Sequence, residues 1–467
     1  MSISKSMILN TDSYKVSMFK QYPPGTTGVY SYIESRGGRY DETVFFGLQA
    51  FIKEYLCKPI TRDDIELADT ILTAHGEPFN REGWEYILRE HGGYLPVVIC
   101  AVPEGTVVPV KNVLATIENT DPNCFWLTTW LETALLRAIW YPTTVATQSW
   151  TIKQLIKDFL EKTGDPSTIN FKLHDFSARG NSSLETSGIG AAAHLVNFMG
   201  TDTITGVLYA REYYNADIAG FSIPASEHSI STSYGKNEKQ YVLNMIEQFA
   251  KPGAIFAMVA DTYNVFEFAK MLGDDPEIKE KIVAHGKTGG FVVVRPDSGD
   301  PLAVNQQLIE ILGERFGYTI NSKGFKVLNS VRIIQGDGVN ELSIRTILGG
   351  FAAMGWSADN IAFGMGGALC QMVNRDTQKF AQKASSVCVN GTWRDIQKDP
   401  ITDPGKKSKA GRVKLFFNGV DYVSSVNAPL GWTDKGSHWR DALEEVFRDG
   451  KLVREMNFEE IRSNSNK

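Results

Sequence analysis

The sequence of 467 residues contains few cysteines, no long apolar run and no excess of basic residues. Its five cysteines, Cys57, Cys100, Cys124, Cys370 and Cys388, are far apart and never spaced as CxxC. Neither a disulfide framework nor a zinc site is therefore indicated, and a reducing, cytoplasmic compartment is expected. The formal charge of −6 argues against a nucleic-acid-coating role, because displacing phosphate counterions requires a basic surface.

The N-terminal stretch MSISKSMILNTDSYK has no long apolar segment, and no later segment has about 20 uninterrupted apolar residues. We therefore expect neither a secretory signal peptide nor a membrane-spanning helix. No HExxH motif or other three-ligand pattern is present, so a permanent transition metal is not expected. An anionic substrate would have to be held by local cations.

Apolar runs alternate with polar corners from about residue 170 onward. Such continuous runs are typical of buried parallel strands, and the spacing of Val304, Leu308, Ile311 and Leu312 after Pro301 predicts a helix between two of them. Polar residues follow nearly every run, which favours an α/β barrel, because barrels build their sites from strand-end loops. The clearest pairs are 255–260 before Asp261, 291–294 before Arg295, 331–335 before Gly336, and 361–363 before Gly364.

The two ends of the chain lack this alternation. Segments 97–103 and 107–110 have the pattern of strands, and an aromatic helix is predicted around Trp126, Trp130 and Trp140. These features indicate a separate α+β layer, and strand-like segment 413–417 suggests that the tail packs with it. We predict an α+β domain of residues 1–145 and 385–467, and an α/β barrel-like catalytic domain of residues 146–384.

Two charged residues follow the predicted strand at 291–294. Arg295 can fork to phosphate oxygens, while Asp297 can accept ribose hydroxyls or a metal-bound water. A turn with a surface salt bridge is the alternative. The position after a core strand favours a site for a phosphorylated sugar.

Glu227 and His228 are neighbours in the segment SIPASEHS (222–229). An imidazole oriented by a carboxylate can act as a base, an acid or a phosphate acceptor. The alternative is a core histidine with backbone partners, for which His194, in the apolar run 191–198, is the better candidate.

Glycine-rich corners are a third feature. A helix after Gly364–Gly367 would present backbone N–H groups to a phosphate, and Arg375, about two helical turns further on, could add a cation or simply be a solvated helix charge. Gly336-Asp337-Gly338 is a second such corner, and 174–180 combines a histidine, an acid, an aromatic ring and a guanidinium.

Taken together, these motifs resemble the nicotinamide phosphoribosyltransferase family of type II phosphoribosyltransferases. The match runs in order over nearly the whole chain, so its joint occurrence by chance is negligible. The motifs are TDSYK (11–15), KLHDF (172–176), RG (179–180), GTDT (200–203), PASEHS (224–229), RPDSG (295–299), IQGDG (334–338) and the stretch from FGMGG to NRD (363–376).

The resemblance implies an α/β barrel beside a discontinuous α+β domain, in a homodimer with shared active sites. It implies a pentosyltransferase of NAD salvage that joins nicotinamide to 5-phosphoribosyl diphosphate and releases nicotinamide mononucleotide and diphosphate. Mg²⁺ would be held mainly through substrate phosphates. Such an enzyme must orient two reactants and stabilise a departing anion.

The resemblance also assigns roles by motif position. Phe176 is expected to stack on the pyridine ring, with Tyr14 of the second subunit on its other face, and Asp202 to accept from the carboxamide. The remaining expected contacts are Arg179, Arg295 and His228 to diphosphate, Asp297, Gly336 and Asp337 to ribose, Gly366, Gly367 and Arg375 to the 5′-phosphate, and Asp261 as a supporting or Mg²⁺-linked acid.

In this family the histidine of the matching motif is phosphorylated by ATP, which implies that ATP is a co-substrate and that its hydrolysis tightens binding. Phosphorylation adds charge that can recruit Mg²⁺ and orient diphosphate. Glu227 would then orient His228. The cations expected to guide polyphosphates are Arg36, Lys383, Lys406 and Arg412.

Three departures from the family pattern concern the phosphate loop and the channel beside Phe176. Ser177-Ala178 replaces an expected Gly-Tyr, and Met365 occupies a usual serine position. The region 36–43 is shorter than in the vertebrate enzymes. Affinity or inhibitor access is therefore expected to differ.

Nicotinate phosphoribosyltransferase is the nearest alternative, because it shares the fold and the phosphate chemistry. Asp202 argues against it, since a carboxylate repels a carboxylate substrate whereas an amide donates to it. A barrel glycosidase using Asp297 and Asp337 would leave Arg179 and Arg295 without a purpose. A catalytically silent binding protein would not require the matched polar set.

Overall fold

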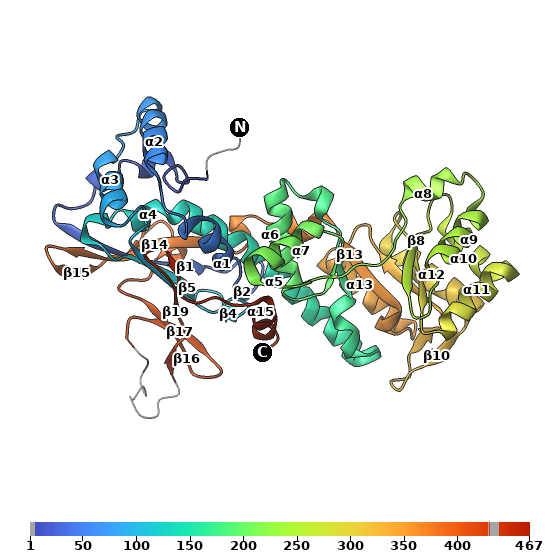
Figure 1. The fold of residues 1–467 in the computed structure, drawn as a ribbon. Helices are drawn as coiled ribbons and strands as arrows, with labels where there is room; N and C mark the ends of the chain where they lie inside the picture. Colours follow the sequence, from blue (N-terminus) through green and yellow to red (C-terminus); the bar gives the residue numbers. More distant parts are fainter. Residues whose placement is uncertain (1–4, 428, 430–438) are drawn as a thin grey trace. The chain divides into compact units, whose positions relative to one another are not determined.

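The computed structural model describes residues 5–427, 429 and 439–467. The chain forms two compact units (Figure 1). Unit 1 comprises Met1–Thr147, Ala210–Asp217 and Val373–Lys467, and unit 2 comprises Gln148–Tyr209 and Ile218–Met372. Within the described ranges, no helix has both the length and the apolar character that crossing a membrane would demand.

Unit 1 is built on a seven-stranded antiparallel sheet in the order β15-β14-β1-β5-β3-β19-β20. Strands from both ends of the chain share this sheet, so the prediction that the tail packs with the N-terminal layer is confirmed. The strands are β1 (Thr26–Ser35), β3 (Val97–Ala101), β5 (Val113–Asn119), β14 (Phe380–Val389), β15 (Thr392–Asp395), β19 (Glu444–Arg448) and β20 (Lys451–Leu452).

Smaller sheets and several helices complete unit 1. Trp84, Trp126 and Trp130 pack edge to face with ring centroids 4.8, 5.2 and 5.5 Å apart, so the predicted aromatic helix anchors a core. The other elements are β2 (Glu42–Val44), β4 (Val107–Pro109), β16 (Lys414–Phe417), β17 (Tyr422–Ser425), β18 (Arg440–Asp441), α1 (Leu48–Phe51), α2 (Arg62–His75), α3 (Arg81–Glu90), α4 (Leu127–Trp130), α15 (Phe458–Ser465) and the first part of α5 (Glu132–Thr163).

Two segments predicted for the barrel-like domain belong to unit 1 instead. Strand β14 pairs with β1 from Val389 to Phe380, so residues 380–384 cannot be separated from that sheet. The segment Ala210–Asp217 is held in the same unit, because Tyr214 Oη donates to the buried Glu104 carboxylate at 3.0 Å. Strand pairing between distant segments, rather than local composition, sets these boundaries.

Unit 2 contains a six-stranded sheet in the order β7-β6-β13-β12-β9-β8, with every pair parallel. Its strands follow the predicted apolar runs, and Val292 and Val294 of β9 are completely buried, as expected for a sheet covered on both faces. The strands are β6 (Leu173–Asp175), β7 (Gly200–Thr201), β8 (Ile255–Val259), β9 (Phe291–Arg295), β12 (Val331–Gln335) and β13 (Ile361–Met365).

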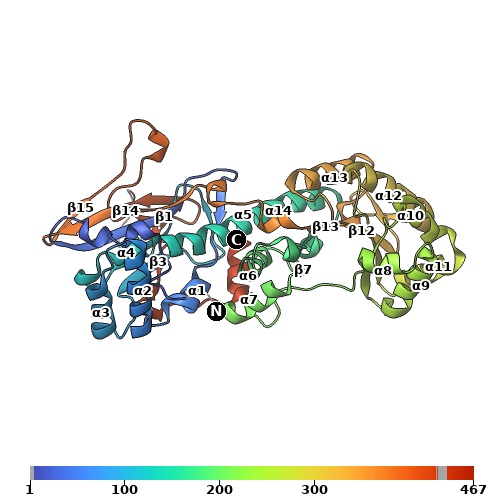
Figure 2. The ribbon, with the colours of Figure 1, turned by 90° about the horizontal axis from the view of Figure 1, so that it is seen from above.

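Helices alternate with these strands, and α9, α11 and α12 pack on β8, β9 and β12 (Figure 2). The predicted helix after Pro301 is confirmed as α12, which Asp300 caps by accepting from Ala303 N at 2.8 Å. The remaining elements are α6 (Leu184–Leu195), α7 (Ile204–Tyr214, its last residues in unit 1), α8 (His228–Ser233), α9 (Glu238–Phe249), α10 (Val265–Asp274), α11 (Pro276–Lys287), α12 (Pro301–Phe316), β10 (Tyr318–Ile320), β11 (Lys326–Leu328), α13 (Glu341–Ala353) and α14 (Gly367–Cys370).

An irregular stretch, residues 221–226, connects the two edge strands of this sheet, and we call it the closing segment. Phe221 O accepts from Thr201 N of β7 at 3.0 Å, and Ser226 N donates to Ala257 O of β8 at 3.1 Å. The predicted barrel is therefore a parallel half-barrel of six strands, completed by a segment that is not itself a regular strand.

Candidate active site

The polar side chains of the candidate site gather where the parallel strands of unit 2 end. Arg295 is the last residue of β9, while Asp261 and Asp337 lie just beyond β8 and β12. Parallel strands present all their carboxyl ends at one edge, so residues far apart in the sequence meet there. The strand-end cluster consists of His228, Asp261, Arg295, Asp297, Ser298 and Asp337.

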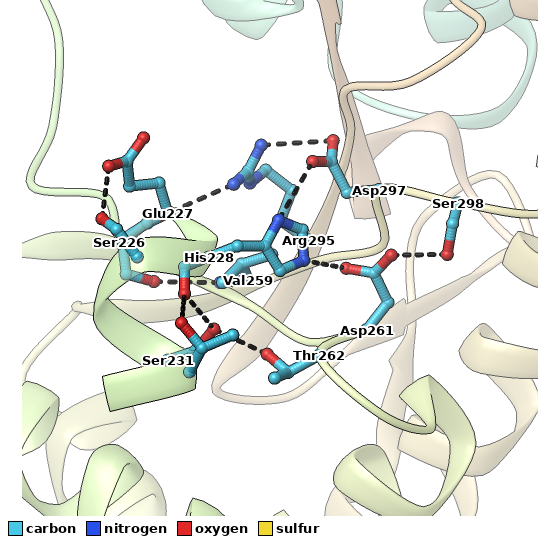
Figure 3. Close-up of polar contacts among 12 residues, drawn as sticks. Ser226, Glu227, His228, Ser231, Val259, Asp261, Thr262, Arg295, Asp297 and Ser298 are labelled. Carbon is cyan, nitrogen blue, oxygen red and sulfur yellow. Dashed lines mark hydrogen bonds and ion pairs between the residues drawn. The ribbon is translucent and has the colours of Figure 1, made fainter. Parts of the chain in front are cut away.

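His228, the first residue of α8, lies between two carboxylates of this cluster (Figure 3). Its Nε2 is 3.0 Å from Asp261 Oδ1, and its Nδ1 is 3.8 Å from Asp297 Oδ2. The second Asp261 oxygen accepts from Ser298 Oγ at 2.5 Å. Because the Asp261 side chain is 7% exposed and held at both oxygens, it fixes the imidazole ring rigidly.

The prediction that Glu227 orients His228 is wrong, because Asp261 has that role. Glu227 is exposed, and its carboxylate accepts a short hydrogen bond from Ser229 Oγ. Adjacent residues at the start of a helix project about 100° apart, so the sequence neighbour of His228 faces another direction.

Arg295 and Asp297 form the second part of the cluster. Arg295 Nη1 donates to Asp297 Oδ1 at 3.3 Å, and Nη2 donates to the backbone oxygen of Ser226 at 3.1 Å. Burial raises the pKa of Asp297, and the negative charges of Asp261 and Asp337 raise it further, against the lowering effect of Arg295 and His228. The cluster therefore concentrates carboxylate charge that a cation would stabilise.

A second group of predicted residues lies at the ends of β6 and β7. Phe176 packs against the small apolar layer of Ala257, Val293 and Ile334 inside the half-barrel. Asp202 lies beside it, because its backbone N donates to Asp175 O at 2.9 Å. Asp202 Oδ1 accepts from Ser222 Oγ of the closing segment at 2.5 Å. The structure therefore places an aromatic residue and an acid side by side in the backbone, at the ends of two paired strands.

Asp175, which the sequence marked only as the acid of the 174–180 corner, holds this corner together. It is fully buried, and its Oδ1 accepts from Ser177 N at 2.7 Å while Oδ2 accepts from Thr201 Oγ1 at 3.3 Å. One carboxylate thus ties the Phe176 turn to the Asp202 turn. Its position beside Phe176 was the available signal, but an acid at a strand end does not reveal which way it points.

His194 is the core histidine that the sequence predicted. Burial lowers its pKa to about 4, so the ring is neutral near pH 7. Its Nδ1 is 2.9 Å from Ser149 Oγ, and its Nε2 is 3.3 Å from Gly200 O.

The glycine corners have their own supports. Gln335 Nε2 donates to Asp337 O at 2.7 Å, and Asn305 Nδ2 donates to Gln335 Oε1 at 2.6 Å, so two residues missed from the sequence hold the Gly336-Asp337 turn. Gly366 lies between β13 and α14, and Gly367 is the first residue of α14. Arg179 is exposed on the short helix Ala178–Gly180 after β6.

The expected helical link from Gly367 to Arg375 is wrong. Helix α14 ends at Cys370, and Arg375 lies in a separate 3₁₀ turn, Arg375–Thr377, that belongs to unit 1. Its guanidinium is paired with Asp376 at 2.9 Å. A phosphate role for Arg375 stays a prediction from its motif.

The other predicted residues of unit 1 differ in burial and in whether their side chains form ion pairs. Arg36 Nε and Nη2 are buried without a hydrogen-bond partner among the described residues, and Nε forms an ion pair with Glu34 Oε1 at 3.5 Å. Burial lowers the pKa of Lys383, and the charge of Arg36 adds to that effect. Arg412 by contrast is bidentate on Glu118, at 2.8 and 2.6 Å. Lys406 pairs with Asp403 at 3.2 Å, and Tyr14 is 61% exposed.

One further group of metal-binding residue types, His91, Asp121 and Cys124, lies close together in the described part of unit 1. Burial raises the pKa of the Cys124 thiol to about 12, so it stays protonated near neutral pH. Asp121 is already hydrogen-bonded, 2.8 Å from His91 Nε2 and 2.9 Å from Tyr86 Oη. These bonds account for the group as local support without a metal.

Solved structures with the same fold include a nicotinate-nucleotide pyrophosphorylase from Pyrococcus furiosus, with a TM-score of 0.65, 18% identity and coverage of 100% of this chain and 96% of that one. Human nicotinic acid phosphoribosyltransferase matches with a TM-score of 0.55, 14% identity and coverage of 98% and 92%. The fold is that of a type II phosphoribosyltransferase.

Sequence comparison is more specific. Residues 171–451 match the model of the nicotinate phosphoribosyltransferase (NAPRTase) family, and residues 6–99 match the N-terminal domain model of nicotinamide phosphoribosyltransferase. The chain is 51% identical to a nicotinamide phosphoribosyltransferase from Xanthomonas campestris over 98% of both sequences, and 31% identical to one from Acinetobacter baylyi over 97% and 95%. The chain belongs to the NAPRTase family.

A stability prediction follows from the close approach of Phe176 to Gly364. A Cβ on Gly364 would lie 1.9 Å from Cε2 of the Phe176 ring, whereas one on Gly349 in α13 would meet nothing within 4 Å. We expect Gly364→Ala to lower the free energy of unfolding by about 1–3 kcal/mol through overpacking. Gly349→Ala, the matched control, should leave it unchanged or raise it by up to about 1 kcal/mol. Urea denaturation measures both, and equal stability of the two variants would contradict the contact.

Proposed function

We propose that this chain is a nicotinamide phosphoribosyltransferase of NAD salvage, which converts nicotinamide and 5-phosphoribosyl diphosphate to nicotinamide mononucleotide and diphosphate. The observation that carries the choice of base is the corner where Asp202 lies beside Phe176. An aromatic face can stack on the pyridine ring, and a carboxylate can accept from a carboxamide N–H but repels a carboxylate. The relatives named above from Xanthomonas and Acinetobacter support the same assignment.

In the proposed reaction the pyridine nitrogen of nicotinamide attacks C1 of the ribose. The bond from C1 to the diphosphate oxygen breaks, and the ring nitrogen becomes positively charged. Asp202 Oδ1 is already occupied by Ser222, so Oδ2 is the oxygen available for the carboxamide. Phe176 fixes the plane of the ring, which aligns the nitrogen with C1.

The strand-end cluster serves the sugar and the leaving group in this proposal. Arg295 donates to diphosphate, and Asp297 and Asp337 accept from ribose hydroxyls and face the positive charge that develops at C1. Gly336 leaves room for the sugar, because even a Cβ there would lie 3.4 Å from Asp297 Oδ1 and from the Phe176 ring. Gly366 and Gly367 offer backbone N–H groups to the 5′-phosphate.

Residues of unit 1 complete the proposal. The charges of Arg36 and Lys383 interact, and such a pair of cations suits a polyphosphate. Arg375, Lys406 and Arg412 are further cations of unit 1, and Arg179 is one of unit 2. The exposed Tyr14 suits stacking in the site of a second subunit. We therefore propose a cytoplasmic homodimer with shared active sites.

His228 is the proposed phosphate acceptor from ATP. With its Nε2 proton donated to Asp261, the neutral ring carries its lone pair on Nδ1. Nδ1 attacks the γ-phosphorus, the bond from that phosphorus to the bridging oxygen breaks, and ADP leaves. The phosphorylated ring then adds negative charge, which would recruit Mg²⁺ and so orient diphosphate.

Mg²⁺ is the proposed metal, and the site chemistry fits it. Asp261 and Asp297 offer hard oxygen atoms of the kind that Mg²⁺ prefers, and the negative charges of Asp261 and Asp337 act on Asp297. Held mainly through the substrate phosphates and supported by these acids, Mg²⁺ would neutralise phosphate charge. The residues described above orient the reactants.

The choice of base is tested with Asp202→Ala. We expect kcat/KM for nicotinamide to fall about 10- to 100-fold, the value of one charge-assisted hydrogen bond, while turnover of nicotinate changes less. Asp158→Ala, an exposed acid on α5, is the matched control. Equal losses with both bases, or a native preference for nicotinate, would instead favour a nicotinate phosphoribosyltransferase, which the family model's name also allows.

ATP coupling is tested with His228→Ala. We expect stimulation by ATP and acid-labile phosphate on the protein to disappear, while basal transfer survives, because the transfer step needs orientation and charge rather than this imidazole. His75→Ala, an exposed histidine on α2, is the control. Full ATP coupling in His228→Ala would exclude a phosphohistidine at this position.

The part played by Asp261 is tested with Asp261→Asn. An amide that donates to Nε2 forces the ring proton onto Nδ1, so we expect phosphohistidine formation to slow by on the order of 100-fold or more. Glu227→Gln should cost much less, because Glu227 contacts Ser229. Rapid-quench measurement of phosphorylation compares the two, and the reverse order would restore Glu227 as the orienting residue.

A further inference from the structure

Three buried groups beside the strand-end cluster form a closed ring of hydrogen bonds. Val259 N donates to Ser226 Oγ at 3.0 Å, and Tyr241 Oη donates to Val259 O at 3.3 Å. The two hydroxyls, of Ser226 and Tyr241, share a short hydrogen bond. Since the Tyr241 proton is used on Val259, the Ser226 hydroxyl is the donor to Tyr241. Each member then donates once and accepts once.

This ring replaces strand pairing at the open edge of β8. Ala260 N donates to Arg295 O of β9, so the N–H and C=O of Val259 point the other way, toward the closing segment. Backbone pairing on that side ends with the bond from Ser226 N to Ala257 O. Beyond it, two side-chain hydroxyls satisfy Val259. The ring is dry, because Ser226, Tyr241 and Val259 are 6%, 1% and 0% exposed, and buried polar groups without partners are costly.

Two members of the ring, Ser226 and Val259, lie next to Arg295 and His228 of the candidate site (Figure 3). The carbonyl oxygen of Ser226 accepts from Arg295 Nη2 at 3.1 Å, and His228 follows Ser226 by two residues at the start of α8. Ser226 is held to β8 by its backbone N and its Oγ, and to α9 by the bond of Oγ to Tyr241. These bonds therefore fix the carbonyl oxygen that accepts from Arg295 and the start of the helix that carries His228.

We propose that Ser226 and Tyr241 are positioning residues, which set Arg295 and His228 for diphosphate without touching it. This inference rests on the proposed function only in naming diphosphate as the ligand of that cluster. Tyr241, on α9, thereby makes a helix outside the sheet part of the site's support.

Two substitutions test the proposal with little change in volume. Tyr241→Phe and Ser226→Ala each break the ring, so we expect each to weaken binding of inorganic diphosphate with Mg²⁺ by about 10- to 100-fold, the effect of a small misplacement of binding groups. Because either change alone opens the ring, the double variant should be no weaker than the single ones within about twofold. KM for nicotinamide should change less than the diphosphate Kd.

Tyr22→Phe is the matched control, because Tyr22 is a partly buried tyrosine whose hydroxyl lies 2.9 Å from another hydroxyl, that of Thr129 in unit 1. It should keep the native Kd for diphosphate.

Calorimetric titration measures the Kd, and thermal denaturation checks that each variant is folded. If Ser226→Ala does not fold, Tyr241→Phe decides alone. An unchanged Kd in a folded Tyr241→Phe variant, or additive losses in the double variant, would overturn the proposal. Preference of the native protein for nicotinate would overturn the proposed substrate but not this test, since diphosphate is common to both reactions.

Discussion

Parallel pairing of the strands of unit 2 is the constraint on which the candidate site depends. Strands β8, β9 and β12 run in one direction, so residues that follow them converge at one edge although up to 76 positions separate Asp261 from Asp337. There His228 lies 3.0 Å from the carboxylate of Asp261 and 3.8 Å from that of Asp297. The charges, the hydrogen bonds and the proposed chemistry all follow from that convergence.

Much of the half-barrel was predictable from the sequence, because buried parallel strands consist of continuous apolar runs. The runs at β8, β9, β12 and β13 were predicted within a few residues, as was the start of α12 at Pro301. The segments assigned to the wrong domain, 210–217 and 373–384, belong to unit 1 through contacts with distant residues such as Glu104 and β1. No local property of a segment reveals such partners.

The site divides in the same way. Residue types at strand ends could be selected, and the structure brings His228, Asp261, Arg295 and Asp297 together. The hydrogen-bond partner of His228 could not be predicted. Glu227 is its neighbour in sequence, yet Asp261, thirty-three residues away, holds the imidazole ring. Supporting residues such as Asp175, Gln335 and Tyr241 escaped notice since a buried acid, amide or phenol is recognisable only through what it contacts. The roles of the unit 1 cations came from the family resemblance.

The closing segment couples ligand binding to the hydrogen bonds at both edges of the half-barrel. The closing segment is irregular and is held to β7 and β8 by only a few hydrogen bonds. Separating it from these strands therefore costs less free energy than separating two regularly paired strands of the sheet. At one end of the closing segment Ser222 donates to Asp202, and at the other end Ser226 accepts from Arg295. A ligand that contacts both groups of residues binds only when the closing segment is hydrogen-bonded to both strands. Its binding free energy is therefore reduced by the free energy of forming those hydrogen bonds. Amide exchange at Thr201 and Ala257 would therefore report occupancy of the site from the backbone itself.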